Sequence, residues 1–251
     1  MDPKKEKLIA ELKQAHEELK AIEKYHRVGK GSYLRNMVYG ANDGIITTFA
    51  VVAGVAGAQL PIKVVLILGV ANLVADGISM AMGNFLGTKS ENDFKRKERQ
   101  MEAMEVDLIP EEERKEIEEI YRKKGFKGEL LIKAVDAITS DKKIWVDEMM
   151  VNELNIIPNE DESPGKNALA TFMAFGAAGF LPLMPYIFGF SYGGVFQTAI
   201  IMTGLALFAV GSVRTIFTKK NWILAGLEML LVGAAAAAVS YGLGYWLTLI
   251  I

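Results

Sequence analysis

Five long runs of apolar residues divide the sequence, and each is long enough to cross a bilayer as a helix. They cover about residues 34–60, 63–87, 167–187, 194–213 and 222–251. A hydrocarbon core of about 30 Å needs roughly 20 apolar residues in helical form. The third and fourth runs lack the polar stripe that a buried helix of a soluble protein shows to water. The pattern therefore predicts an all-α membrane protein with five transmembrane helices.

Two polar segments interrupt this pattern. At the start of the chain, Leu8, Leu12 and Leu19 recur at helical spacing among Lys and Glu residues, which is typical of an amphipathic helix on a membrane surface or on another domain. After the second run comes a polar, helix-forming segment, here called the insert. The expected organisation is an N-terminal segment, two spans, the insert and three further spans, at residues 1–33, 34–88, 89–166 and 167–251.

The distribution of Lys and Arg predicts the orientation in the membrane. Basic residues are frequent in the N-terminal segment and the insert, and Lys219 and Lys220 lie between the fourth and fifth runs. Because Lys and Arg accumulate in cytoplasmic loops, these three regions are expected in the cytosol. The C-terminus is then expected on the opposite side.

Composition narrows the function classes. Hydrophobic residues make up 51% of the chain, the mean hydropathy is +0.22, the formal net charge is −2, and there is no cysteine. A disulfide framework, a thiolate metal site and a cysteine nucleophile are therefore excluded. A GxxxxGK[ST] phosphate loop is also missing, so an ion gradient is the expected energy source. We expect no enzymatic activity and no nucleic-acid partner.

Three acidic residues lie inside the apolar runs. Of the 30 Asp and Glu residues, only Asp43, Asp76 and Glu228 fall outside the two charged blocks at residues 1–35 and 89–166. A carboxylate at the centre of a spanning helix costs on the order of 2.5–3.5 kcal/mol on insertion scales and usually marks an ion or proton path. These three residues are therefore candidates for a transport path.

Helix rise places Asp43 and Met80 at similar depths. Asp43 follows Arg35 by eight residues and Met80 precedes Lys89 by nine, which gives about 12 Å and about 13–14 Å from the cytoplasmic boundary. A carboxylate and a thioether together suit a divalent cation of intermediate softness. Asp76 lies one helical turn from Met80, close to the midplane.

Other interpretations of these residues stay open. Asp43 could pair with a neighbouring helix, and Met80 could simply fill space in the core. The triplet at residues 42–44, Asn-Asp-Gly, favours a local opening of the first helix that would offer carbonyl oxygens to an ion. Glu228 is either a proton carrier or the partner of Arg214 across a short loop.

The insert contains glutamates and methionines at helical spacing. Glu102 and Glu105 form one i, i+3 pair, Glu113 and Glu116 form another, and Pro110 separates the two helices. A later helix carries exposed methionines at 149 and 150 on one face with Glu153. Glutamates from several helices form carboxylate metal sites in helical bundles, although a single acidic pair is usually a solvated helix face. The insert lacks an ExxH motif, which argues against a ferritin-type iron oxidase.

Two motifs in the first two spans resemble the vacuolar iron transporter family. They are residues 39–44, YGANDG, and residues 71–80, ANLVADGISM; the glutamate pairs and residues 149–153, MMVNE, extend the resemblance. It implies a homodimeric, five-span proton/ferrous-iron antiporter with Asp43 and Met80 on its ion path and Asp76 or Glu228 as proton carriers. It also implies metal capture by Glu102, Glu105, Glu113, Glu116, Met149, Met150 and Glu153. Gly40-x-x-x-Gly44 and Gly83-x-x-x-Gly87 would allow close helix approach at the dimer interface.

Together these features predict a transporter that exports Fe²⁺ from the cytoplasm in exchange for protons. Mn²⁺ is the alternative cargo, and Mn²⁺, Zn²⁺ and Co²⁺ are expected surrogates at the metal sites. A membrane-bound iron buffer or sensor without transport is the rival from another class. The Lys/Glu-rich composition without cysteine suggests a prokaryotic source, for which the cell membrane is the expected location; a eukaryotic source would imply the vacuolar membrane.

Overall fold

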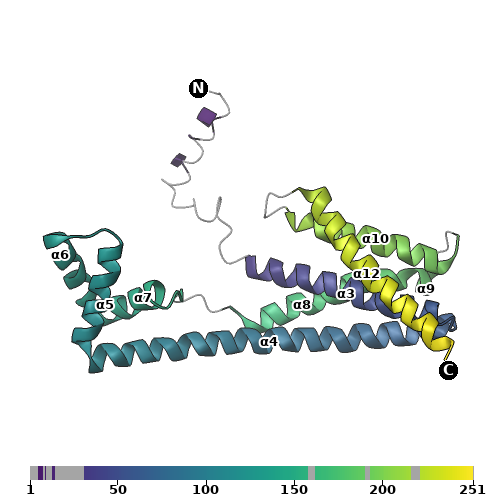
Figure 1. Ribbon diagram of the computed structural model, residues 1–251, viewed down its shortest axis with the longest axis horizontal. Coiled ribbons are helices and arrows are strands. Elements are labelled where there is room, and N and C mark those ends of the chain that lie inside the picture. Colours follow the sequence, from purple (N-terminus) through teal and green to yellow (C-terminus); the bar gives the residue numbers. More distant parts are fainter. Residues whose placement is uncertain are drawn as a thin grey trace. The chain divides into compact units, whose positions relative to one another are not determined.

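The computed structural model describes residues 31–157, 162–189, 193–215 and 221–250, together with residues 5–7, 9, 13 and 14. Most of the N-terminal segment, including both histidines, and the Lys219-Lys220 loop lie outside the described residues. Every secondary-structure element within them is a helix (Figure 1).

Five helical segments are long and apolar enough to cross a membrane. They are Tyr33–Gly57, Ile62–Leu108, Pro164–Phe188, Val195–Val213 and Trp222–Thr248. The corresponding elements are α3 (Gly31–Gly57), α4 (Ile62–Leu108), α8 (Pro164–Gly179) with η1 (Leu181–Leu183) and α9 (Met184–Phe188), α10 (Val195–Val213) and α12 (Trp222–Thr248). This confirms the predicted all-α, five-span fold with an insert between the second and third spans.

Proline residues interrupt the third span. Pro182 lies in the 3₁₀ turn η1 and Pro185 near the start of α9. Since proline has no backbone N–H, it removes a hydrogen bond from the helical ladder. The amides of Leu183 and Met184 both donate to the carbonyl of Phe180, at 3.1 and 3.2 Å, so the turn tightens before the helix resumes.

The chain divides into two compact units, which we describe separately. The membrane unit comprises residues 1–85 and 165–251, and the insert unit comprises residues 86–164. Helix α4 is continuous across the division. Its first part is apolar, and charged residues dominate from Lys89 onward.

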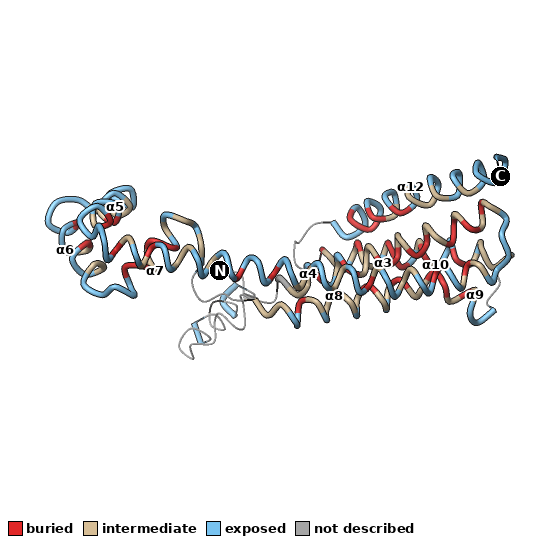
Figure 2. The backbone as a smooth tube through the Cα atoms, turned by 90° about the horizontal axis from the view of Figure 1, so that it is seen from below, coloured by how far each residue is buried: buried red, intermediate tan, exposed pale blue. Residues whose placement is uncertain are grey.

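Helix α3 forms the centre of the membrane unit. It packs against α10, α12 and η1, and Ile45 and Val52 on its inner face are fully buried. Figure 2 shows buried positions repeating along α3 and α10, whereas most of α12 is exposed. Large apolar side chains such as Leu205 and Leu231 are 67% and 73% exposed, as expected for a surface that faces hydrocarbon.

Glycines allow α3 to approach α8 very closely. A Cβ at Gly40 would lie 2.7 Å from the carbonyl oxygen of Thr171, and one at Gly44 would lie 2.4 Å from that of Phe175. The small residues therefore serve an interface within one chain. The expectation that Gly40-x-x-x-Gly44 forms a dimer interface was wrong, because that face is already covered by α8. A Cβ at Gly83 or Gly87 would meet no atom of the described residues within 4 Å.

Gly44→Ala is expected to destabilise the protein because the added methyl group meets backbone atoms of Phe175 that no rotamer change can move. Overpacking of this kind typically costs about 1–3 kcal/mol. The matched control is Gly176→Ala, the same change at a position of α8 where an added Cβ meets no atom of the described residues within 4 Å, which should be neutral or stabilising by up to about 1 kcal/mol. Thermal unfolding in detergent measures both. Equal melting temperatures for the two variants would contradict the close α3–α8 contact.

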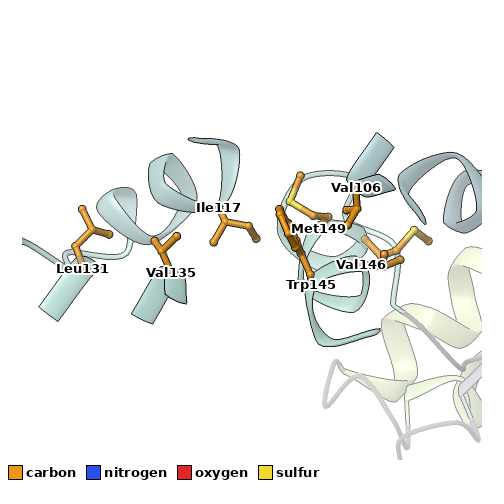
Figure 3. Packing of buried hydrophobic residues seen from close by; sticks show 8 residues of the cluster. Val106, Ile117, Leu131, Val135, Trp145, Val146 and Met149 are labelled. Atoms are coloured by element: carbon orange, nitrogen blue, oxygen red, sulfur yellow. The ribbon is translucent and has the colours of Figure 1, made fainter. Parts of the chain in front are cut away.

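The insert unit has its own hydrophobic core. Besides the end of α4 it contains α5 (Pro110–Lys123), α6 (Gly128–Thr139) and α7 (Lys142–Asn152). Figure 3 shows buried side chains from these helices, among them Ile117 of α5 and Trp145 of α7. The helix α6, between the two glutamate-bearing helices and the methionine-bearing helix, contributes Leu131 and Val135 to this core.

Candidate metal-handling sites

Three glutamates of the insert unit converge at the turn between α4 and α5. Carboxylate oxygens of Glu102, Glu105 and Glu113 all lie within 4.8 Å of one another. The turn is short because α4 ends at Leu108 and Pro110 starts α5, where proline is favoured since its missing N–H needs no partner. The chain therefore turns sharply away from the axis of α4 (Figure 1), and the carboxylates on the two sides of the turn come together.

Glu102 and Glu113 are buried, and no base is paired with either of them in the part of the chain that the structure describes. Each is only 4% exposed, and the Oε2 atom of each has no hydrogen-bond partner among the described residues. Burying an ionised carboxylate is costly unless a cation or hydrogen-bond donors compensate for its charge. A divalent metal bound by carboxylate oxygens would supply that compensation.

The same environment changes the acidity of the cluster. Burial, followed by repulsion from Glu153 and Glu113, raises the pKa of Glu102 to about 7. Burial and the neighbouring Glu116 raise the pKa of Glu113 to about 7. At neutral pH these groups are therefore divided between the protonated form and the anionic form that binds metal.

Glu116 and Glu153 extend the cluster toward solvent. Both are exposed, and partial loss of hydration together with Glu116 raises the pKa of Glu153. Glu153 follows the end of α7, where its N–H donates to the carbonyl of Met149 at 2.9 Å. The structure thus brings together the five glutamates that the sequence indicated; their role as ligands stays a prediction.

The expectation that the two methionines are exposed was wrong. Met149 is 0% and Met150 1% exposed, and Figure 3 shows Met149 next to Trp145 and Val106 in the insert core. Both apolar pairs of α7, at 145–146 and 149–150, face the core because they are one turn apart. Any contact of the thioethers with metal would therefore be made from the interior of the insert.

Helix α7 also carries two acids that sequence reasoning missed. Asp147 forms an ion pair with Arg99 of α4. Glu148 accepts hydrogen bonds at Oε1 from Tyr121 Oη at 3.0 Å and from Lys124 Nζ at 2.8 Å, both near the end of α5.

In the membrane unit, Asp43 of α3 and Asp76 of α4 are partly buried and close enough to interact electrostatically. Met80, one turn from Asp76, is also partly buried. A further turn along α4, Asn84 Nδ2 donates to Thr171 Oγ1 of α8 at 2.6 Å. The polar face of α4 therefore lies partly against another helix of the membrane unit and not entirely against lipid.

Helix α3 does not open at residues 42–44, so that prediction was wrong. The helix is continuous from Gly31 to Gly57. The carbonyl oxygen of Asp43 accepts a hydrogen bond from Thr47 Oγ1 at 2.8 Å, a local bond that a helix tolerates readily. The side-chain carboxylate is thus the group of Asp43 that an ion would meet, and its place on an ion path stays a prediction.

Glu228 is paired with Arg214, which confirms one of the two interpretations of this residue. Arg214 Nη2 lies 2.6 Å from Glu228 Oε2. The residues belong to the end of α10 and the start of α12, so the pair joins these two spans. Its participation in proton transfer stays untested.

Comparison with known proteins gives one family and several relatives. The profile of the VIT family matches residues 34–245. The chain is 37% identical to a vacuolar iron transporter of Toxoplasma gondii over 235 residues, covering 90% of this chain and 78% of the relative. It is 32% identical to vacuolar iron transporter 2 of Oryza sativa subsp. japonica, covering 85% and 87%. It is also 32% identical to a vacuolar iron transporter of Plasmodium falciparum, covering 92% and 89%.

Proposed function

The chain belongs to the VIT family, and from that premise we propose that this multi-pass membrane protein exports Fe²⁺ from the cytoplasm in exchange for protons. The names of the relatives support iron as the cargo. The N-terminus and the insert are placed in the cytosol and the C-terminus outside, as the distribution of basic residues indicates.

The observation that carries this proposal is the convergence of unpaired glutamates in the insert. Glu102 and Glu113 are buried and have no paired base among the residues that the structure describes, and Glu105 lies within reach of both. This arrangement is costly for folding and is explained by a bound divalent cation. Exposed Glu116 and Glu153 would collect the ion from solution, and Met149 and Met150 would select for a softer cation than Ca²⁺ or Mg²⁺.

Asp43 and Met80 are proposed to conduct the ion through the membrane. Asp43 offers a carboxylate and Met80 a thioether to a cation that has lost part of its water. Asp76 lies close enough to Asp43 to interact with it electrostatically, and it is the candidate proton carrier that would couple the two fluxes. Glu228 is the weaker candidate for proton transfer because Arg214 already neutralises it.

Several finer points belong to the same proposal. The transporter is taken to act as a homodimer with a path along the dimer axis, as the family resemblance implies. Mn²⁺ is the alternative cargo, and Zn²⁺ and Co²⁺ are surrogates at the carboxylate sites. Location in a cell or a vacuolar membrane depends on the source organism.

The purified protein in liposomes with an acidic lumen is expected to take up Fe²⁺, and uptake should fall to the level of protein-free liposomes when a protonophore removes the pH gradient. A simultaneous rise in lumenal pH would show proton exchange. Competition with Mn²⁺ in the same assay determines cargo preference. Binding of Fe²⁺ by the protein without any flux would contradict the proposal and favour the buffer or sensor. The compact insert unit is the observation that supports this alternative.

A further inference from the structure

Basic residues that flank the glutamate cluster are each paired with an acid outside it. Arg99 pairs with Asp147, and Arg114 pairs with Asp136 of α6. On α5, the Nζ atom of Lys115 lies 2.7 Å from Glu112 Oε1. None of these three bases, which lie next to the cluster in the sequence, is therefore paired with a carboxylate of the cluster.

Arg99 is the one of these bases that shares helix α4 with Glu102. It lies three residues before Glu102 on α4, and residues three apart are neighbours on a helix surface. Its side chain is 34% exposed and that of Asp147 is 28% exposed. The pair is thus partly shielded from water, and it directs the guanidinium toward α7.

We propose that Asp147 is a positioning residue that holds Arg99 away from Glu102 and so keeps the carboxylate cluster available to a divalent cation. The inference rests on the proposed capture of metal by the insert. Asp147 does not touch the cation. It forms an ion pair with Arg99, whose guanidinium would otherwise compete with the cation for Glu102.

Competition follows from the chemistry of the guanidinium group. Arginine stays protonated at all accessible pH values and binds carboxylates through two parallel N–H donors. If Arg99 were released, it would find in Glu102 a buried carboxylate with an unpartnered oxygen. An opposite charge at 4–6 Å typically changes proton affinity by a factor of about 10 to 1,000, and metal affinity should fall by at least about tenfold for the same reason.

Glu148 provides a control for loss of helix position alone. Its Oε1 accepts from Tyr121, Lys124 and Asn152, at 3.0, 2.8 and 2.8 Å. Glu148→Gln therefore weakens the attachment of α7 to α5. The base that it releases, Lys124, lies eight residues after Glu116, about 12 Å along a helix. A merely structural role of the α7 acids predicts similar effects of Glu148→Gln and Asp147→Asn.

The test measures Fe²⁺ binding to the full-length protein in detergent by anaerobic titration calorimetry, with thermal unfolding in parallel. Asp147→Asn is expected to weaken binding by about tenfold. The double variant Asp147→Asn with Arg99→Met should return to within about threefold of wild type, because the competing charge is gone. Asp147→Asn with Arg99→Lys keeps that charge and should stay weak, and Glu148→Gln should bind nearly as wild type.

Two results would overturn the inference: unchanged binding by Asp147→Asn, or a double variant with Arg99→Met that binds as weakly as Asp147→Asn. A wild-type protein that binds no Fe²⁺ would instead refute metal capture by the insert, the proposal on which this inference depends. The first failure appears in the variants and the second in the wild-type protein, so the two failures are distinguishable.

Discussion

Replacing Asp43 with alanine should reduce Fe²⁺ uptake into acid-loaded liposomes at least about tenfold, a loss of ~1.4 kcal/mol or more in the barrier to transport. A cation that sheds water within a membrane needs an anionic partner there, since the hydrocarbon offers none. Asp43 is partly buried in the first span and interacts with Asp76. Its main-chain carbonyl is already engaged with Thr47, so no backbone ligand replaces the lost carboxylate.

Two further variants separate charge from shape and from non-specific effects. Asp43→Asn keeps the size of the side chain and should be almost as inactive as alanine. Asp93→Ala removes an acid from the charged part of α4, where Asp93 is exposed, and should transport normally. Undiminished flux through folded Asp43→Ala would remove this residue from the path, and the assignment of Met80 at the same depth would lose its main support.

The membrane spans could be predicted from the sequence because the bilayer imposes a length on each of them. Runs of about 20 apolar residues reveal a spanning helix irrespective of its neighbours. Their ends were less accurate, as at Gly57, where α3 stops three residues before the apolar run does. The division of the third span at Pro182 depends on local backbone chemistry within an otherwise continuous apolar run.

Contacts between helices were harder to predict. The spacing of Gly40 and Gly44 correctly indicates close approach, but a spacing rule does not identify the partner, which is α8 of the same chain. Likewise, the methionines at 149 and 150 look exposed beside Glu153 in the sequence. They are buried because the helix that bears them packs through Trp145 and Val146 onto the insert core.

The glutamate cluster shows an intermediate case. The i, i+3 spacing of each pair predicts a shared helix face, and Pro110 predicts that the chain turns between them. Burial of Glu102 and Glu113 without a base was not predictable, because it depends on which face of α5 the core residue Ile117 turns inward. The pairing of Arg99 with Asp147 depends equally on the packing of α7.

Metal capture by the insert should weaken steeply as the solution becomes acidic. The pKa values of Glu102 and Glu113 are raised to about 7, chiefly by burial, so below pH 7 the cation must displace a proton from each. Well below the pKa, one displaced proton costs tenfold in affinity per pH unit and two cost a hundredfold. Because half of each carboxyl is already protonated at pH 7, we expect the dissociation constant for Fe²⁺ to rise about 5- to 30-fold between pH 7 and pH 6. Titration calorimetry at several pH values measures it, and Glu102→Gln should reduce the slope by about one proton.

The same shifts predict an opposite effect of pH on the metal-free protein. A carboxyl whose pKa is higher in the folded state than in the unfolded state binds more protons when folded, so protonation stabilises the fold. This contribution is fully present below about pH 4.5 and is lost as pH rises through about 7; it amounts to about 1–3 kcal/mol per group. The melting temperature of the metal-free protein should therefore fall from pH 5 to pH 8, and Fe²⁺ should raise it most at pH 8.

Because a bound cation replaces the proton as the compensating charge, the melting temperature of Glu113→Gln should be less sensitive to pH and should rise less when metal is added. A metal-free melting temperature that increases with pH over this range would show that these carboxyls are ionised at no cost, and the cluster would then lose its physical reason for binding a cation.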